Sequence, residues 1–367
     1  MTNNDQSELP CVVLFNINGS GMGHMSTCLA YANRLRGRAR PVFFSLASAM
    51  EMIHEMGFEG DYFVSRFWSR ASAWNWDQQL ALRLGLLFER VRPDVVVFDG
   101  TWPFRGLLHA AAAYGDVRMV WSDLTLYKPG WREVPVSKNN FDLVIKLGEL
   151  GSGFSVDREA MPARQVTIPP VTILREDELL NRDDARKALG LAPNKRYALF
   201  SLGPGNRKDV SGIGRGLIDE ISARGYTVVW TRTPISANDV PLPDGVVPIS
   251  VYPVVRYMRA FDVIVSAAGY NTCCEVLQSG IPTLFVPNTL VSDDQTRRAE
   301  MVAQSSPAVV SPCKSAKQQA QAVERLLALS TGEQQSSTVL DLGGAEHAAD
   351  EILALTDTGR GEAGKSP

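Results

Sequence analysis

Long apolar runs are missing from this sequence of 367 residues. None reaches the roughly 20 residues that a membrane-spanning helix requires, and the amino terminus, MTNNDQSELP, lacks the charged-then-apolar pattern of a secretory signal. A basic excess is missing too, because the formal net charge is −3 and no global positive field attracts nucleic acid. We therefore expect a cytoplasmic protein without a nucleic-acid partner, whose contact with a membrane would be peripheral at most.

Cysteine is scarce, and its five residues have no regular spacing: Cys11, Cys28, Cys273, Cys274 and Cys313. An odd number without framework spacing argues against a disulfide scaffold, and the adjacent pair does not form a metal knuckle. We expect these residues to be reduced cytosolic thiols.

What the sequence does contain is an alternation of apolar strands and helical segments. In the first half, strands are expected over 11–17, 41–46, 94–100, 117–123 and 141–147, and helices over 23–36, 48–56 and 75–91. In the second half, strands are expected over 196–203, 226–232, 245–250, 262–269 and 282–288, and helices over 211–224, 253–260, 270–279, 293–305, 314–329 and 344–355. Apolar strands separated by helices predict parallel sheets covered on both faces. The fold class is therefore α/β, with two doubly wound, Rossmann-like domains.

The pair Pro169-Pro170 interrupts this alternation, because two prolines stiffen the chain and remove two backbone donors. Asp183 or Asp184 is then expected to cap a helix that leads to Gly190. We place an N-terminal domain at 1–170 and a C-terminal domain at 171–335, followed by a helix at about 340–357 and a disordered tail at 358–367. Ligands of such sheets bind at the carboxyl ends of strands, so the functional loops are expected to line a cleft between the domains.

The loop 18–24, NGSGMGH, follows the first expected strand and opens a helix. Its glycines permit a tight turn close to a ligand, and the helix start offers free amides and a positive dipole end. His24 stands where a dinucleotide fingerprint has glycine or alanine, and no acidic residue ends the next strand to hold a ribose, which disfavours NAD binding. The dipole favours a neutral His24 that can accept a proton from a hydroxyl. The alternative is a plain helix-capping turn with an incidental histidine.

Three segments of the second half have the features of a nucleotide-sugar site. The turn at Ser266 to Gly269 opens a helix, which suits a phosphate, and Glu275 within that helix could accept two hydrogen bonds from a ribose diol. Asp294 and Gln295 could hold sugar hydroxyls, and the loop FSLGPGNRKD (200–209) could cover a diphosphate. Ordinary alternatives are a solvated acid near a helix start, N-capping by Asp293 or Asp294, and a surface turn.

Taken together and in order, these motifs resemble those of GT-B-fold glycosyltransferases. The sequence is most similar to the group that contains the peptidoglycan N-acetylglucosaminyltransferase and the plant galactolipid synthases. The resemblance is carried by GSGMGH (19–24) and by Ser266, Gly269, Glu275, Gly280, Pro282, Pro287 and the Asp294-Gln295 pair. It extends over most of the chain and is strong in 11–35 and 262–302. The sequence departs from the group's pattern at Ser20 and Met22, and at LGPGNR (202–207), where the group has its second glycine-rich loop.

The resemblance implies that the C-terminal domain binds a nucleotide-sugar donor, UDP rather than TDP. The N-terminal domain would bind the acceptor, and the last helix would cross back onto it. Glu275 would hold the ribose, Asp294 and Gln295 the sugar, and the two turns the diphosphate. The residues expected at the donor are Gly21, Gly23, Gly203, Gly205, Asn206, Arg207, Ser266, Ala268, Gly269, Tyr270, Asn271, Glu275, Asp294 and Gln295.

The expected reaction is an inverting transfer to an acceptor hydroxyl or amine, without a metal or cofactor. No Asp-x-Asp motif adjoins a donor-like strand, and helix N-termini can stabilise the leaving diphosphate. His24 is the first candidate for the general base. Asp99 and Asp123, which end two strands, are alternatives, and Asp99 could instead orient His24 or cap the next helix. The acceptor is open between a small molecule, a glycan and a lipid-linked compound.

The segment 65–92 mixes Trp68, Trp74 and Trp76 with arginines, which suits an acceptor lid or a peripheral membrane patch. A core-packing helix with an exposed basic edge is the alternative interpretation. Three other functions also stay open: a UDP-sugar hydrolase, a non-hydrolysing UDP-sugar 2-epimerase, and a non-catalytic nucleotide-sugar-binding protein.

Overall fold

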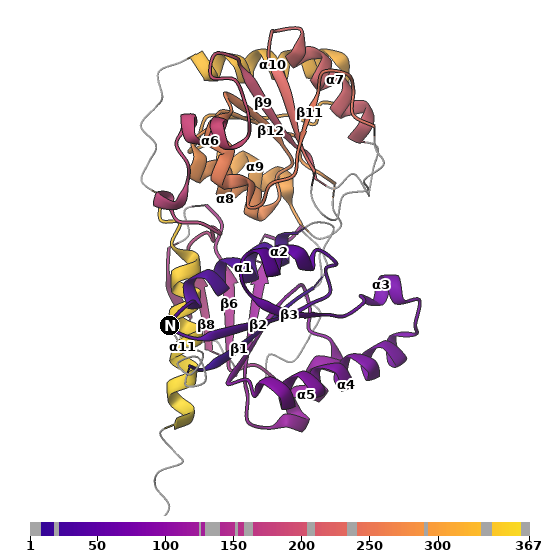
Figure 1. The fold of residues 1–367 in the computed structure, drawn as a ribbon, viewed down its shortest axis with the longest axis vertical. Helices are drawn as coiled ribbons and strands as arrows, with labels where there is room; N and C mark the ends of the chain where they lie inside the picture. Colours follow the sequence, from indigo (N-terminus) through magenta and orange to yellow (C-terminus); the bar gives the residue numbers. More distant parts are fainter. Residues whose placement is uncertain are drawn as a thin grey trace, which may run out of the picture. The chain divides into compact units, whose positions relative to one another are not determined.

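The computed structural model describes residues 9–17, 22–124, 126–128, 140–150, 153–157, 164–203, 210–232, 241–289, 293–331 and 340–360. The chain forms two compact units (Figure 1). The first consists of Met1–Thr125, Gly130–Ile173 and Gly343–Pro367, and the second of Leu126–Pro129 and Leu174–Leu342.

The first unit is built on an eight-stranded sheet with the order β3-β2-β1-β4-β5-β6-β8-β7. Its strands are β1 (Cys11–Asn16), β2 (Arg40–Ser45), β3 (Glu59–Tyr62), β4 (Val95–Asp99), β5 (Arg118–Leu124), β6 (Leu143–Leu147), β7 (Ser155–Asp157) and β8 (Arg164–Ile168). All neighbours pair in parallel except β7 and β8, which are antiparallel. Every residue of β1 and β4 is buried, which explains why both strands are almost wholly apolar.

The helices of the first unit are α1 (Gly23–Leu35), α2 (Met50–Glu55), α3 (Arg66–Ser69), α4 (Ala73–Val91), α5 (Arg105–Tyr114) and α11 (Gly344–Arg360). Helix α4 begins where the Ser72 side chain accepts a hydrogen bond from the Asn75 amide at 3.2 Å. It buries Leu80, Leu84, Leu87 and other apolar residues at helical spacing in the core below the sheet. Of the segment 65–92, helix α4 therefore packs into the core, as the alternative interpretation had it, whereas Trp68 on α3 and Trp74 in the first turn of α4 are exposed.

The second unit is built on a six-stranded parallel sheet with the order β11-β10-β9-β12-β13-β14. Its strands are β9 (Tyr197–Ser201), β10 (Thr227–Thr231), β11 (Val247–Ile249), β12 (Val263–Ser266), β13 (Thr283–Phe285) and β14 (Ala308–Val310). Its helices are α6 (Arg182–Ala188), α7 (Val210–Ser222), α8 (Tyr270–Ser279), α9 (Gln295–Ala303) and α10 (Ala316–Thr331). The predicted α/β class with largely parallel sheets is confirmed.

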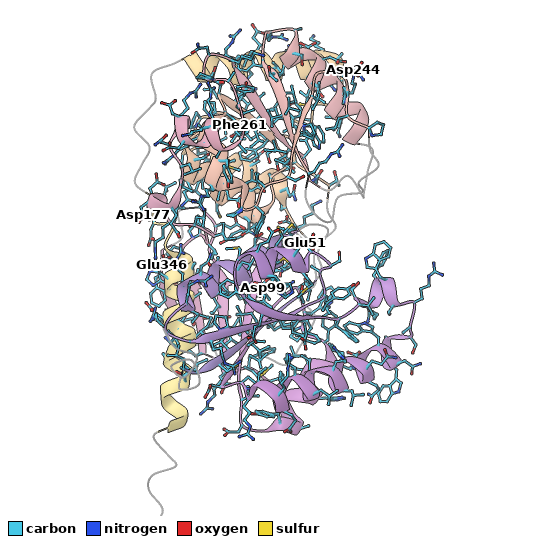
Figure 2. The ribbon with its side chains drawn as sticks, in the orientation of Figure 1. Glu51, Asp99, Asp177, Asp244, Phe261 and Glu346 are labelled. Carbon is cyan, nitrogen blue, oxygen red and sulfur yellow. The ribbon has the colours of Figure 1, made fainter. Side chains whose placement is uncertain are left out.

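The carboxy-terminal helix α11 packs on the first unit, along α1 (Figures 1 and 2). The buried Arg34 of α1 donates from Nε to Oε1 of Glu346 on α11 at 2.5 Å. Gly344 starts the helix so close to the double proline that a Cβ on it would lie 2.0 Å from the Pro169 carbonyl oxygen. Helix α11 continues to Arg360, so residues 358–360 of the predicted disordered tail are helical, while 361–367 lie outside the described residues.

Several details differ from the sequence predictions. Elements α3, α5, β3, β7, β8 and β14 were not expected, and residues 254–260 form a 3-10 helix. Helix α6 is capped by Asn181, whose side chain accepts from the Asp184 amide at 3.0 Å, and not by Asp183 or Asp184. The observed boundary follows Ile173, and Leu126–Pro129 returns to the second unit, where Tyr127 bridges Asp293.

Candidate functional site

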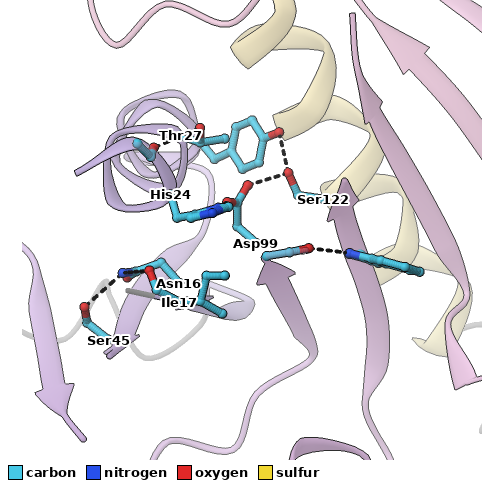
Figure 3. A network of polar contacts seen from close by, with 11 residues as sticks. Asn16, Ile17, His24, Thr27, Ser45, Asp99 and Ser122 are labelled. Atoms are coloured by element: carbon cyan, nitrogen blue, oxygen red, sulfur yellow. Dashed lines mark hydrogen bonds and ion pairs between the residues drawn. The ribbon is translucent and has the colours of Figure 1, made fainter. Parts of the chain in front are cut away.

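The first unit brings His24 and Asp99 together at the carboxyl ends of its central strands (Figure 3). His24 is the second residue of α1, which follows β1, and Asp99 is the last residue of β4. Nδ1 of His24 lies 2.5 Å from Oδ1 of Asp99. The Asp99 side chain is almost wholly buried, whereas 27% of the His24 side chain is exposed. No described residue contacts the other ring nitrogen, Nε2, with a hydrogen bond. The pair can therefore present one imidazole nitrogen to a ligand.

Asp99 thus orients His24, which is one of the roles weighed for it from the sequence. It does not cap the next helix, because Phe104 occupies the N-cap position of α5 and makes no side-chain cap. An Nδ1–H donor facing a buried carboxylate leaves Nε2 as the acceptor nitrogen. This is the tautomer that a general base requires.

The hydroxyl groups of Ser122 and Tyr31 form a chain of hydrogen bonds that ends on the Asp99 carboxylate. Ser122 Oγ, on β5, donates to Oδ2 of Asp99 at 2.7 Å, and Tyr31 Oη lies 3.0 Å from Ser122 Oγ (Figure 3). A serine hydroxyl has only one proton, so the Tyr31 hydroxyl must be the donor to Ser122. Burial, with a further contribution from the nearby Asp99 charge, raises the pKa of Tyr31 well above its usual value and keeps this phenol protonated. Sequence reasoning missed both residues, because hydroxyl side chains in a strand and a helix carry no functional signal of their own.

Asp123, the other candidate base, is engaged elsewhere. It lies on β5 next to Ser122, and its Oδ2 forms an ion pair with Nζ of Lys146 on β6. Neighbouring residues of a strand point to opposite faces, so Asp123 does not share the Ser122 network. Its assignment as a base stays a prediction, and the geometry favours His24.

The glycine-rich loop next to His24 is only partly described. Gly23 opens α1 and its carbonyl accepts from Thr27 Oγ1 at 3.2 Å, whereas Gly21 lies outside the described residues. The preceding Asn16 is buried at the end of β1 and donates from Nδ2 to Ser45 Oγ at 3.0 Å. Its Oδ1 is buried without a hydrogen-bond partner among the described residues.

In the second unit, the turn at Ser266 to Gly269 joins β12 to α8 as predicted. The hydroxyl of Ser266 is not presented to a ligand, because it donates to the Ser201 carbonyl of β9 at 2.9 Å. Ala268 and Tyr270 are buried, Asn271 is half-buried, and Gly269 is the N-cap of α8 without any side-chain cap. The start of α8 can therefore contribute backbone amides and its dipole to an anion, while the Ser266 side chain positions the turn.

Glu275 is the most unusual acid of the second unit. It is half-buried on α8, and no described residue donates a hydrogen bond to it or pairs with it. Burial raises the pKa of its carboxyl to about 8. A half-buried carboxyl without a hydrogen-bond donor or a cation beside it is typical of a binding site, because a ligand can supply the missing hydrogen-bond donors. A ribose diol would do so.

Asp294 and Gln295 form hydrogen bonds that fix the start of α9 and the chain before it. Asp294 is the N-cap and accepts from the Arg297 amide at 3.2 Å, which is the ordinary role weighed for it. Gln295 is buried, and its Oε1 accepts from the Asn288 amide at 2.9 Å, so it fixes the chain that follows β13. No described residue is bonded to the Gln295 amide nitrogen, which leaves this group for a ligand.

Sequence reasoning missed Arg298, a buried cation beside the same turn. Its Nη1 donates to Asp293 Oδ1 at 2.7 Å and to the Ala268 carbonyl at 3.3 Å, and its guanidinium carbon lies 5.8 Å from the centre of the Tyr270 ring. The arginine therefore ties α9 to the turn before α8. In the sequence, this arginine stands four residues after the N-cap aspartate, one turn into an amphipathic helix, and that position is the signal that could have identified it.

Of the remaining predicted donor residues, only Gly203, after β9, is among the described residues. Gly203 follows the strand with a φ of 90°, a conformation that favours glycine. Gly205, Asn206 and Arg207 lie outside the described residues. Within the described part of the chain, no group of three or more His, Cys, Asp or Glu could hold a metal ion, and no helix is long and apolar enough to span a membrane. The five cysteines are buried thiols.

Comparisons with known proteins place this site in context. Residues 243–350, which include Glu275, Gln295 and Arg298, match the family described as glycosyltransferase family 28 C-terminal domain. A relative from Bacillus licheniformis, UDP-N-acetylglucosamine--N-acetylmuramyl-(pentapeptide) pyrophosphoryl-undecaprenol N-acetylglucosamine transferase, is 24% identical over 231 residues. That alignment covers 60% of this chain and 61% of the relative, which is less than two thirds of its length.

Solved structures with the same fold cover nearly the whole chain. MurG from Acinetobacter baumannii aligns with a TM-score of 0.57 at 14% identity, over 94% of this chain and 99% of that protein. The glycosyltransferase of kitacinnamycin aligns with a TM-score of 0.59 at 15% identity, over 95% of this chain and 100% of that protein. The chain therefore has the GT-B fold, and it is similar to the peptidoglycan N-acetylglucosamine transferase, as the sequence motifs indicated.

Proposed function

We propose that this GT-B protein is an inverting, metal-independent glycosyltransferase that moves a sugar from a nucleotide-sugar to an acceptor hydroxyl or amine. The observation that carries the proposal is the His24–Asp99 pair, with Nδ1 held 2.5 Å from a buried carboxylate and Nε2 without a described partner. Such an imidazole is oriented to take a proton from an acceptor. The family 28 match in residues 243–350 supports a nucleotide-sugar as the donor, with UDP as the nucleotide.

In the proposed reaction, the acceptor oxygen or nitrogen loses a proton to Nε2 of His24 as it forms a bond to the anomeric carbon of the donor. The bond from that carbon to the diphosphate breaks on the opposite face, which inverts the configuration. Asp99 stabilises the imidazolium that forms, and Ser122 keeps the carboxylate oriented. The start of α8 stabilises the charge that develops on the leaving diphosphate.

Donor recognition is assigned to the second unit. Glu275 accepts two hydrogen bonds from the ribose diol, since its carboxyl has no described partner of its own. The turn before α8 and the loop after β9 hold the diphosphate. The Gln295 amide nitrogen holds a sugar hydroxyl, and Asp294 contributes through the helix start that it caps.

The test is a panel of UDP- and TDP-sugars, with release of the nucleotide measured with and without candidate acceptors. We expect release that depends on an acceptor, and loss of at least about a hundredfold in kcat for His24→Ala, because general-base catalysis contributes roughly 10²–10⁴. The matched control is His109→Ala, which removes an exposed histidine of α5.

The outcomes separate the competing functions. Nucleotide release without any acceptor would identify a hydrolase, and a changed sugar with no release would identify an epimerase. Binding of a UDP-sugar without turnover would identify a non-catalytic binding protein. Near-normal transfer by His24→Ala would remove His24 from the role of base.

A further inference from the structure

A cavity of about 370 Å³ opens in the first unit at the carboxyl end of its sheet, where Ile17 follows β1 and Leu46 follows β2. Its apolar lining comes from Ile17, Leu46, Phe67, Ala71, Ala73 and Phe104. Ile17 places the cavity at the same end of the sheet as the His24–Asp99 pair, because its backbone amide donates to the Asp99 carbonyl oxygen at 3.2 Å. A molecule in this cavity would therefore lie next to the strand ends that carry the proposed base.

One polar group in the lining has no partner. Ser65 is only 4% exposed, and its Oγ has no hydrogen-bond partner among the described residues. Serine at the N-cap of a helix ordinarily accepts a hydrogen bond from that helix, yet Ser65 precedes α3 without making this bond. A buried hydroxyl without a partner is costly, and a polar atom of a bound molecule would remove the cost.

The mouth of the cavity has exposed aromatic rings. Phe67 lines the cavity and is 75% exposed, and the ring of Trp68 packs against it edge-on at a centroid distance of 5.0 Å. Large aromatic side chains at this level of exposure are typical of surfaces that bind another apolar group. Among the described residues, Arg66 is the only charged residue of the lining, and none of them pairs with its guanidinium group.

We propose that this cavity binds the acceptor and that the acceptor is a free, apolar ring compound with hydroxyl groups, not a saccharide. The inference rests on the proposed function and adds the substrate class to it. A sugar acceptor would bury several hydroxyl groups and would need a partner for each, whereas Ser65 and Arg66 are the only polar side chains that the described residues contribute to the lining. A volume of about 370 Å³ suits a compound of one to three fused rings, within the range of ordinary ligand pockets.

The test uses two soluble probes with the full-length protein: 2-naphthol, and 2,6-dihydroxynaphthalene, which offers a second hydroxyl as a partner for Ser65. Binding is measured by calorimetry and by ligand-observed NMR. We expect the diol to bind about fivefold tighter than 2-naphthol, the effect of one added hydrogen bond. Ser65→Ala should abolish this preference while it leaves the binding of 2-naphthol within twofold.

A second variant tests the position of the cavity without relying on Ser65. Ala73→Phe places a ring in the cavity mouth from an exposed site at the start of α4, and it should weaken both probes at least tenfold. The matched control is Ala113→Phe on the exposed face of α5, which should change neither affinity. Equal binding by Ala73→Phe and the wild type would overturn the proposal.

Further arms separate this inference from the proposed function and from a membrane role. If the probes fail to bind while a UDP-sugar still binds, the cavity is not an apolar acceptor site and the proposed function stands. If the probes bind as expected but no donor gives transfer, the glycosyltransferase proposal fails and the cavity remains. A third outcome would be that neither probe binds but the wild type co-sediments with phosphatidylglycerol vesicles and Ala73→Phe does not. That result would overturn the proposal in favour of a lipid surface.

Discussion

Glu275 makes a sharp prediction about stability, because its carboxyl is half-buried on α8 without a described partner. Burial raises its pKa in the folded protein from 4.5 to about 8. Between these two values the unfolded chain is ionised while the folded chain holds the proton. The folded state therefore binds more protons, and the free energy of unfolding falls as the pH rises through this window. Below pH 4.5 and above about 8, the contribution no longer changes.

The size of the effect follows from the same two values. At about 1.4 kcal/mol per pH unit, the gap from 4.5 to about 8 corresponds to an upper limit of about 5 kcal/mol. The Glu275 side chain keeps some contact with solvent, which lowers the realised value, so we expect about 2 kcal/mol. Glu275→Gln removes the ionisable group and keeps nearly the same volume. The variant should match the wild type at pH 4.5 and be more stable by this amount at pH 8.5 and above.

The assay is differential scanning calorimetry of both proteins at intervals from pH 4.5 to 9, which separates the unfolding of the two units. Glu300→Gln is the control, since it changes an exposed glutamate of the neighbouring helix α9. The reasoning is refuted if the difference between Glu275→Gln and the wild type does not vary with pH, or if the control shows the same pH dependence.

Three other predictions follow from described contacts. Affinity for UDP should rise about tenfold per pH unit between pH 6 and 8 and level off above that, because the ribose diol binds the ionised Glu275. Titration calorimetry should show no such pH dependence for Glu275→Gln. Tyr31→Phe should lower kcat about fivefold with KM unchanged and shift the acid limb of the pH–rate profile, whereas the control Tyr197→Phe, in the second unit, should leave both unchanged. Gly344→Ala should lower the free energy of unfolding by about 2 kcal/mol in denaturant titrations, because its Cβ would meet the Pro169 carbonyl oxygen. The control Gly85→Ala, in open space on α4, should raise the free energy of unfolding by up to about 1 kcal/mol. Equal effects of the two substitutions would show that the contact at the start of α11 is not tight.

Much of the fold could be predicted because the strands are buried on both faces. The continuous apolar runs at β1, β4, β9 and β12 predict buried strands, and each strand was placed within three residues of its observed ends. The missed elements lack such signals. Helix α5 has Phe104 at its N-cap instead of a capping side chain, and β8 is a short strand with alternating exposure.

The candidate site was predictable in its residue types but not in its pairings. His24 and Asp99 were each identified from their places after a strand, yet their contact across 75 positions depends on β1 and β4 being neighbours in the sheet. Ser122 follows from the same register, because Asp99 of β4 pairs with it directly. Capping was harder to predict, since Asn181, Asp183 and Asp184 all suit a helix start and only the backbone decides among them.

The attachment of α11 has a consequence for how the protein is made. The first unit needs residues 343–360 to cover α1, but the ribosome delivers them only after every residue of the second unit has been synthesised. Until then, the buried guanidinium of Arg34 has no Glu346 to pair with, and the face of α1 that α11 covers is open to other surfaces. The second unit, although it comes later in the chain, can therefore complete its core before the first unit receives the helix that covers α1.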